Sequence, residues 1–163
     1  MNSNTECGFC PSRRRFLKTG GAIGLAAWMG ALPGIPRAAA ATAGTALAER
    51  PEIAAGRFGA MSCAQALATT YADLVGLREQ QAKDLASGFG LGMGRKQTCG
   101  ALTVALMLSG LAGKGGNCAA LMDTFEKEMG STQCAFFVDQ FGYSRCRDLL
   151  RFASRQLNAR IFG

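Results

Sequence analysis

Apolar residues recur at helical spacing along most of this chain, and glycines separate one apolar stretch from the next. After Ser62, for example, Cys63, Leu67 and Leu74 fall on one helical face, and Gly76 ends the stretch. The pattern predicts helices over residues 62–75, 77–87, 99–112, 117–129, 131–137 and 144–157. No stretch alternates apolar and polar residues as a half-buried strand does. We therefore expect an all-α fold, a compact bundle of about five to six short helices.

The beginning of the chain has a different pattern. The run Ser12-Arg13-Arg14-Arg15-Phe16-Leu17-Lys18 resembles the twin-arginine (Tat) export signal at every position of its Ser/Thr-Arg-Arg-x-Phe-Leu-Lys pattern. A weakly apolar segment over 20–35 and small residues at 38–41 follow, as in a cleavable signal. The segment is shorter than the ~20 strongly apolar residues of a membrane span, and Pro33 interrupts it. The resemblance implies export by the twin-arginine machinery to the periplasm, with no stable membrane anchor after cleavage.

The leader divides the chain into three expected parts. These are a twin-arginine signal peptide over 1–41, a loose lead-in over 42–59 with a short helix around 49–55, and a helical four-cysteine domain over 60–163. Cys7 and Cys10 form a Cys-x-x-Cys pair that would be discarded with the leader. The full chain carries a net charge of +7, but five basic residues and one acidic residue lie in 1–41, which leaves +3. A charge this small removes the main support for nucleic-acid binding.

Histidine is absent from the whole chain. Its absence excludes serine or cysteine triads that use histidine, zinc sites with histidine ligands and histidine-ligated haem. Cysteine is then the main candidate for chemistry, because the part after the leader contains Cys63, Cys99, Cys118, Cys134 and Cys146. Each of these cysteines falls in the first turn of an expected helix, behind a candidate cap: Ser62, Thr98, Asn117, Ser131 and Ser144, respectively. Free N–H groups and partial positive charge at helix starts favour thiolates, as metal ligands, cluster ligands or redox nucleophiles.

A glycine-rich stretch over 88–94 leads into the second of these cysteines. Glycine lets the backbone bend sharply and approach another group closely, so we interpret the stretch as a wall of a buried sulfur site, with Gly90, Gly92, Gly94 and Arg95 beside a cofactor. A plain interhelical loop with a solvated Arg95-Lys96 pair is the alternative interpretation. The glycine spacing does not match the Gly-x-Gly-x-x-Gly nucleotide fingerprint, and the stretch follows a helix and not a strand, which argues against a nucleotide.

Several short motifs together resemble the C_GCAxxG_C_C family of redox-active proteins. They are Ser62-Cys63-Ala64-Gln65-Ala66, the run 86–95, Thr98-Cys99-Gly100-Ala101-Leu102-Thr103, Ala105-Leu106-Met107, Phe125-Glu126, Gly130-Ser131-Thr132-Gln133-Cys134 and Cys146-Arg147. The resemblance covers most of residues 60–158. The sequence departs from the pattern at Thr98, where the family has a glycine, and again at Thr103 or Val104.

The resemblance implies a redox centre made by Cys63, Cys99, Cys134 and Cys146, with an iron–sulfur cluster or another metal as cofactor. It leaves Cys118 outside, on an apolar stripe, where we interpret it as a small core residue. Electron transfer to a redox partner protein is the function we expect. Zinc held by four thiolates, a metal-free thiol–disulfide protein and a disulfide-stapled binding module are the alternatives. The pattern assigns no catalytic residue beyond these thiols.

The last expected helix carries Arg147, Arg151 and Arg155 away from its apolar face. A solvated helix face is the simple interpretation, and a docking patch for an acidic electron-transfer partner is the functional one.

Overall fold

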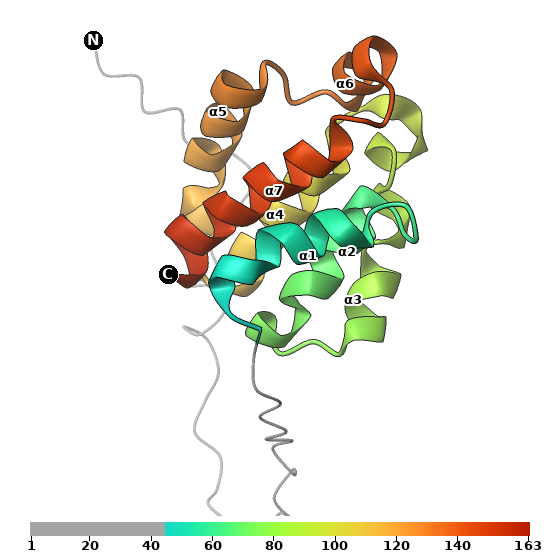
Figure 1. Cartoon of the computed structure of the whole chain (residues 1–163). Helices are drawn as coiled ribbons and strands as arrows, with labels where there is room; N and C mark the ends of the chain where they lie inside the picture. Colours follow the sequence, from blue (N-terminus) through green and yellow to red (C-terminus); the bar gives the residue numbers. More distant parts are fainter. Residues whose placement is uncertain (1–44) are drawn as a thin grey trace, which may run out of the picture. The chain divides into compact units, whose positions relative to one another are not determined.

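The structure is a computed structural model that describes residues 45–163, and this part of the chain is all-helical (Figure 1). Its seven α-helices are α1 (Arg50–Arg57), α2 (Cys63–Tyr71), α3 (Glu79–Leu85), α4 (Gly100–Leu111), α5 (Cys118–Met129), α6 (Cys134–Phe141) and α7 (Cys146–Leu157). Short 3₁₀ or π turns, labelled η, extend or join them. Two isolated β-bridges, and no strand, occur within residues 45–163. The all-α prediction is therefore confirmed.

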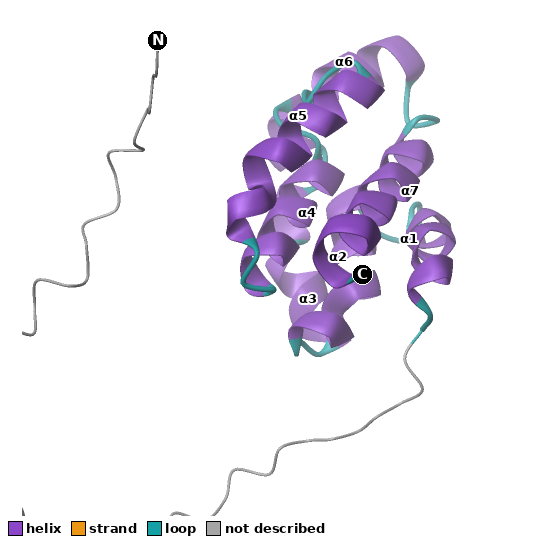
Figure 2. Cartoon of the chain, turned by 90° about the vertical axis from the view of Figure 1, so that its left-hand side faces the viewer, coloured by secondary structure: helices purple, strands orange, loops and turns teal. Residues whose placement is uncertain are grey.

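Helix α4 lies at the centre of the bundle and packs against α2, α5 and α7 (Figures 1 and 2). Leu102, Val104 and Leu108 of this helix are almost fully buried, as its uniformly apolar sequence predicts. Its C-terminal end is less covered, since Leu111 is 56% exposed. Phe125 of α5 continues the core and meets the rings of Phe137 and Phe152 edge to face, with centroids 6.3 and 5.7 Å apart.

The segment before α2 is a packed part of the domain and not a loose lead-in. Helix α1 packs side by side with α7, and Arg50 in its first turn is only 1% exposed. The Arg50 guanidinium donates to both carboxylate oxygens of Asp73, at 2.8 and 2.7 Å, and to the carbonyl oxygens of Thr45 and Thr70. It also lies 5.3 Å from the ring centroid of Tyr71. The sequence pattern misses this docking because the partners of Arg50 are 20 or more residues away, apart from Thr45.

Most helix ends lie where glycines predict them. Gly76 and Gly130 adopt left-handed conformations, with φ of +71° and +92°, and close η3 (Ala72–Val75) and α5. The helix expected from residue 77 begins at Glu79 instead, because the Leu77 amide turns back to the Ala72 carbonyl at 2.9 Å.

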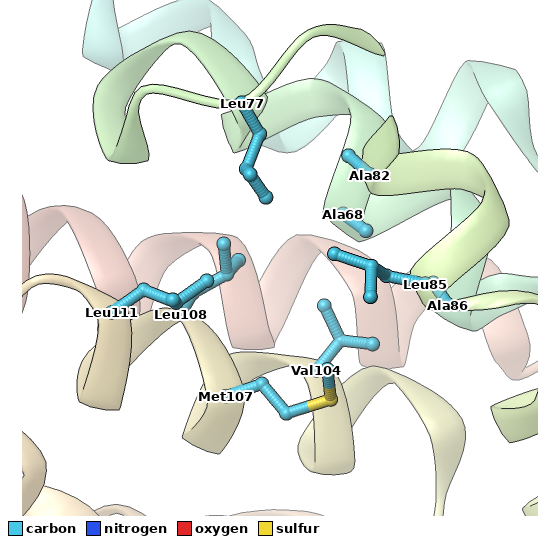
Figure 3. Close-up of a pocket in the computed structure, with 9 residues that line it drawn as sticks. All are labelled: Ala68, Leu77, Ala82, Leu85, Ala86, Val104, Met107, Leu108 and Leu111. Carbon is cyan, nitrogen blue, oxygen red and sulfur yellow. The ribbon is translucent and has the colours of Figure 1, made fainter. Parts of the chain in front are cut away.

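A small apolar cavity of ≈ 20 Å³ separates α3 from α4 (Figure 3). Leu85, Val104 and Met107 point into it from the two helices, with Leu77 above them. Its lining is almost entirely apolar, so it offers no group for chemistry, and it is open to solvent beside Leu85 and Leu111, which are 55% and 56% exposed.

Within residues 45–163, no helix has the length and apolar character that a membrane crossing requires. The twin-arginine signal expected over 1–41 lies outside the described residues.

Candidate functional site

Every cysteine of the described chain stands at the start of a helix. Cys63, Cys118, Cys134 and Cys146 are the first residues of α2, α5, α6 and α7, and Cys99 is the N-cap of α4. The prediction that each cysteine lies in a first helical turn is therefore confirmed. All five are free thiols, and no disulfide joins any two of them within residues 45–163.

Two of the five predicted cap residues, Ser62 and Asn117, stand at helix N-caps, and only Ser62 forms a side-chain cap bond. Ser62 forms a full capping box with Gln65, in which the Gln65 amide donates to the Ser62 hydroxyl at 3.3 Å. Asn117 stands at the N-cap of α5 without a side-chain bond. The Ser131 hydroxyl accepts from the Gln133 amide in the loop before α6. The Ser144 hydroxyl donates to the carbonyl of Phe141, the last residue of α6. These two hydroxyls shape the loops before the helices and do not cap the helices themselves.

Thr98 does not cap α4 but takes part in an isolated antiparallel bridge with Gln133. In this bridge the Cys99 amide donates to the Thr132 carbonyl at 2.8 Å, and the Cys134 amide donates to the Gln97 carbonyl. The bridge therefore fixes the backbones of Cys99 and Cys134 beside one another, although 35 residues separate them in the sequence. The threonine that departs from the family pattern is accommodated at this bridge.

Three of the four predicted redox cysteines line one cavity of ≈ 140 Å³: Cys63, Cys134 and Cys146. They come from three different helices, whose first residues meet at the same end of the bundle. The remaining walls are Phe58, Ser62, Leu91, Val138 and Tyr143. Cys99 does not line this cavity and is 3% exposed. It lies deeper, beside Gly100, whose hypothetical Cβ would come within 2.9 Å of the Cys63 sulfur.

The glycine stretch forms one wall of the cavity through Leu91. Four consecutive residues, Leu91 to Gly94, adopt the left-handed conformation, with φ of 50°, 55°, 56° and 70°. Amide-to-carbonyl bonds from Gly94 to Gly90 (3.0 Å) and from Lys96 to Leu91 (2.9 Å) close this turn. Left-handed backbone costs a non-glycine residue about 1–2 kcal/mol, so Leu91, Met93 and Lys96 (φ 54°) carry strain. The stretch is thus a defined turn and not a flexible loop.

The glycines of this stretch differ in what they approach. A Cβ on Gly90 would come within 2.8 Å of the Ser62 Cβ, and a Cβ on Gly92 within 3.0 Å of the Cys134 Cβ. These two glycines therefore allow close packing against residues that line the cavity. Gly94 borders open space, and Arg95 is exposed, so neither lies against a cavity residue.

Burial raises the pKa of all four cysteines of the predicted redox centre. The pKa rises to about 12 for Cys99 and for Cys146, where neighbouring cysteines add to the effect of burial. Burial raises the pKa of Cys63 as well, and backbone N–H groups, that of Leu91 among them, oppose the rise. Burial and the nearby Cys63 raise the pKa of Cys134. Without a bound cation, these sulfurs are therefore neutral thiols at neutral pH.

One ion pair stands beside the sulfurs. Lys96 of the glycine stretch lies 2.6 Å from Asp139 of α6, and both side chains are partly exposed. Lys96 lowers the pKa of Cys134, whereas Asp139 raises it. The pair fastens the left-handed turn to the helix that carries Cys134. Lys96 is therefore bound to a carboxylate and is not simply a solvated charge.

The other candidate features lie away from the cavity lining. Cys118 is half-buried, and its thiol donates to the Leu106 carbonyl at 3.8 Å. Arg151 forms a fork with both carboxylate oxygens of Glu52, at 2.9 and 3.0 Å, and thereby joins α7 to α1. Arg147 and Arg155 are exposed on the same helix.

Four side chains that line the cavity were not foreseen as site residues: Phe58, Leu91, Val138 and Tyr143. They come from the end of α1, the glycine stretch, α6 and the loop after it. No local pattern distinguishes them from other apolar residues, because only the packing of the helices brings them together. Within residues 45–163, no group of three or more histidine, cysteine, aspartate or glutamate side chains converges as a ready-made site for a metal ion.

Comparison with protein families gave one match, over residues 61–160, to the family described as "Putative redox-active protein (C_GCAxxG_C_C)". No curated protein and no solved structure matched the chain. The matched region runs from just before α2 to within η7 (Asn158–Phe162), and it includes all four cysteines of the predicted centre.

Proposed function

Because the chain belongs to the C_GCAxxG_C_C family of redox-active proteins, we propose that it is an exported electron-transfer protein whose redox centre is an iron–sulfur cluster bound by its cysteines. The observation that carries this proposal is the meeting of Cys63, Cys134 and Cys146 around one cavity, with Cys99 near enough for Cys63 and Cys134 to add to the rise in its pKa that burial causes. These four residues would hold the cluster. The reaction would be one-electron exchange with a partner protein.

The chemistry of the donor set supports a cluster more than a single metal ion. Four thiolates suit both zinc and iron–sulfur clusters. A zinc ion needs its four sulfurs within about 2.3 Å of one point, whereas three of the cysteines here line a space of ≈ 140 Å³, Cys99 is not in its lining, and no group of three or more within residues 45–163 converges on one point. A cluster has several iron atoms and holds its ligands further apart. The cavity fits that larger group better.

The high pKa values of the four thiols also favour a cation-bound centre. A metal-free thiol–disulfide protein needs a thiolate at neutral pH, and a thiol with a pKa of about 12 supplies very little. Bound iron would replace the protons of these sulfurs and would compensate the cost of burying their negative charge. Metal loading would then release protons, and affinity would rise with pH.

The protein's own groups would tune such a centre. A bound cluster would supply a one-electron redox couple. The helix starts and the Leu91 backbone N–H direct partial positive charge at the Cys63 sulfur, which favours the more negative, reduced state. Phe58 and Val138 contribute apolar surface to the lining of the same cavity. The twin-arginine resemblance adds that cofactor loading would take place before export, since this pathway carries folded proteins.

The test is anaerobic purification of the chain after cytoplasmic expression, followed by iron, sulfide and zinc analysis and a visible spectrum. We expect stoichiometric iron and sulfide with charge-transfer absorption. Cys63→Ser, Cys134→Ser and Cys146→Ser should abolish the absorption, and Cys118→Ser is the matched control that should leave it unchanged. Absence of iron, together with intact Cys63–Cys99 or Cys134–Cys146 bridges by mass spectrometry, would overturn the proposal in favour of a disulfide protein.

A further inference from the structure

The cavity that contains the three sulfurs has one exposed wall. Of its eight lining residues, Cys63, Cys134 and Cys146 are buried and four others are half-buried. Tyr143 alone among them is exposed, with 58% of its surface accessible. Of the side chains that line the cavity, Tyr143 is therefore the one that a reagent or partner group in solvent meets most readily.

Tyr143 extends from the loop between α6 and α7 toward the glycine stretch. Its phenol is near enough to Lys96 to add to the rise in the pKa of that lysine, which the hydrogen bond from Asp139 dominates. Tyr143 thus lines the cavity and also lies near the Lys96–Asp139 ion pair. Within residues 45–163 its hydroxyl forms no hydrogen bond, so packing alone holds it in place.

In the loop that carries Tyr143, the backbone is fixed more firmly than the side chain. Gly142 has φ +61° and ψ −148°, a conformation that is essentially limited to glycine. The Tyr143 carbonyl accepts from the Cys146 amide at 3.2 Å, which fixes the backbone one turn before the sulfur. The side chain itself is restrained by packing alone, and 58% of its surface is accessible to solvent.

We propose that the ring of Tyr143 is the access gate of the sulfur cavity: it admits small molecules to Cys63, Cys134 and Cys146 and holds back bulky ones. The gate acts on the chain's own thiols whether or not a cluster binds. A failure of the proposed function therefore leaves this inference standing, and a failure of the gate leaves the proposed function standing.

The experiment measures thiol modification in the reduced, metal-free full chain, at one pH, with site-by-site mass spectrometry. Methyl methanethiosulfonate is the small neutral probe, and 5,5′-dithiobis(2-nitrobenzoate) is the bulky anionic probe. Tyr143→Ala should raise the rate of the bulky probe at the three cavity cysteines by about tenfold, and that of the small probe much less, because the ring no longer has to move aside before a bulky reagent enters. Cys118 in the same molecule is the internal control and should react at its original rate with both probes.

Two further variants separate the ring from the hydroxyl. Tyr143→Phe keeps the ring and should behave like the original chain. Tyr143→Trp enlarges the ring and should slow the bulky probe further, an effect that a loss of folding cannot produce. Phe141→Ala removes another exposed aromatic ring, 47% accessible and outside the cavity lining, and should change nothing. Three outcomes would overturn the proposal. They are equal acceleration of both probes in Tyr143→Ala, acceleration at Cys118, and no change of rate in any variant.

Discussion

Two glycines of α4 predict opposite effects for the same substitution. Gly100 is the first residue of the helix, and a Cβ added there would come within 2.6 Å of the Phe89 carbonyl oxygen and 2.9 Å of the Cys63 sulfur. Gly110 lies near the other end of the helix, with nothing within 4 Å of its hypothetical Cβ. Helix propensity alone predicts that alanine stabilises the chain at both positions.

The size of each effect follows from these contacts. At Gly110, alanine should raise the free energy of unfolding by about 0.5–1 kcal/mol, because it lowers the entropy of the unfolded chain without a new clash. At Gly100, the nearest atom belongs to the backbone and cannot move cheaply. Overpacking of this kind costs about 1–3 kcal/mol, which exceeds the gain in propensity. Gly100→Ala should therefore lower the free energy of unfolding, and the two variants should differ by ~1–3 kcal/mol, since the gain in propensity is common to both.

Urea unfolding of the reduced full chain, followed by circular dichroism at one pH, measures both values. The second readout is the modification rate of Cys63, which should change in Gly100→Ala as its sulfur is displaced and stay constant in Gly110→Ala. If Gly100→Ala proves as stabilising as Gly110→Ala, the close approach of α4 to Cys63 is wrong, and with it the placement of Cys99 behind Cys63.

Three other predictions concern the turn, the buried arginine and pH. Gly92→Ala should destabilise the fold by about 2–4 kcal/mol, because its Cβ would meet the Gln97 backbone at 2.5 Å. Gly94 is also left-handed but borders open space, so Gly94→Ala should cost only ~1 kcal/mol. The urea midpoints of the two variants measure this difference. Asp73→Ala removes the carboxylate that pairs with buried Arg50 and should cost ~2 kcal/mol or more, whereas Asp148→Ala, an exposed partner of Arg151, should cost under ~1 kcal/mol in thermal unfolding. Finally, Cys99 and Cys146 have folded pKa values raised from 9.0 to about 12. The folded state therefore keeps protons that the unfolded state loses, and the unfolding free energy should fall as pH rises from 9 toward 12, by up to ~1.4 kcal/mol per pH unit for each thiol. Cys146→Ser should reduce that slope in urea titrations at pH 8 to 10, and an unchanged slope would contradict the burial of this thiol.

The start of each cysteine-bearing helix could be predicted from the sequence because a helix terminus is a local feature. Ser62 with Gln65 three residues later, and Gly76 after the apolar stretch, indicate where α2 and η3 begin and end. Side-chain caps were predicted less well. Ser131 and Ser144 bond to nearby loop backbone, and short-range patterns do not distinguish that role from a cap.

The glycine-rich stretch could be identified from the sequence, but its conformation could not. Glycine permits left-handed backbone without requiring it, and Leu91 and Met93 adopt it against their own preference. The Lys96–Asp139 pair and the bridge between Thr98 and Gln133 hold the stretch from both sides. These contacts join residues that are more than 30 positions apart, so no local pattern contains them.

The sequence by itself determined that this is a helical chain with cysteines at helix starts, because helix formation and capping depend on neighbouring residues. Only the tertiary structure decided which sulfurs share a cavity. It brought Cys63, Cys134 and Cys146 together, set Cys99 behind them, and placed Tyr143 at the exposed wall. The physical reason is that burial, close approach and access to solvent are properties of packed helices, and each of them depends on residues far apart in the chain.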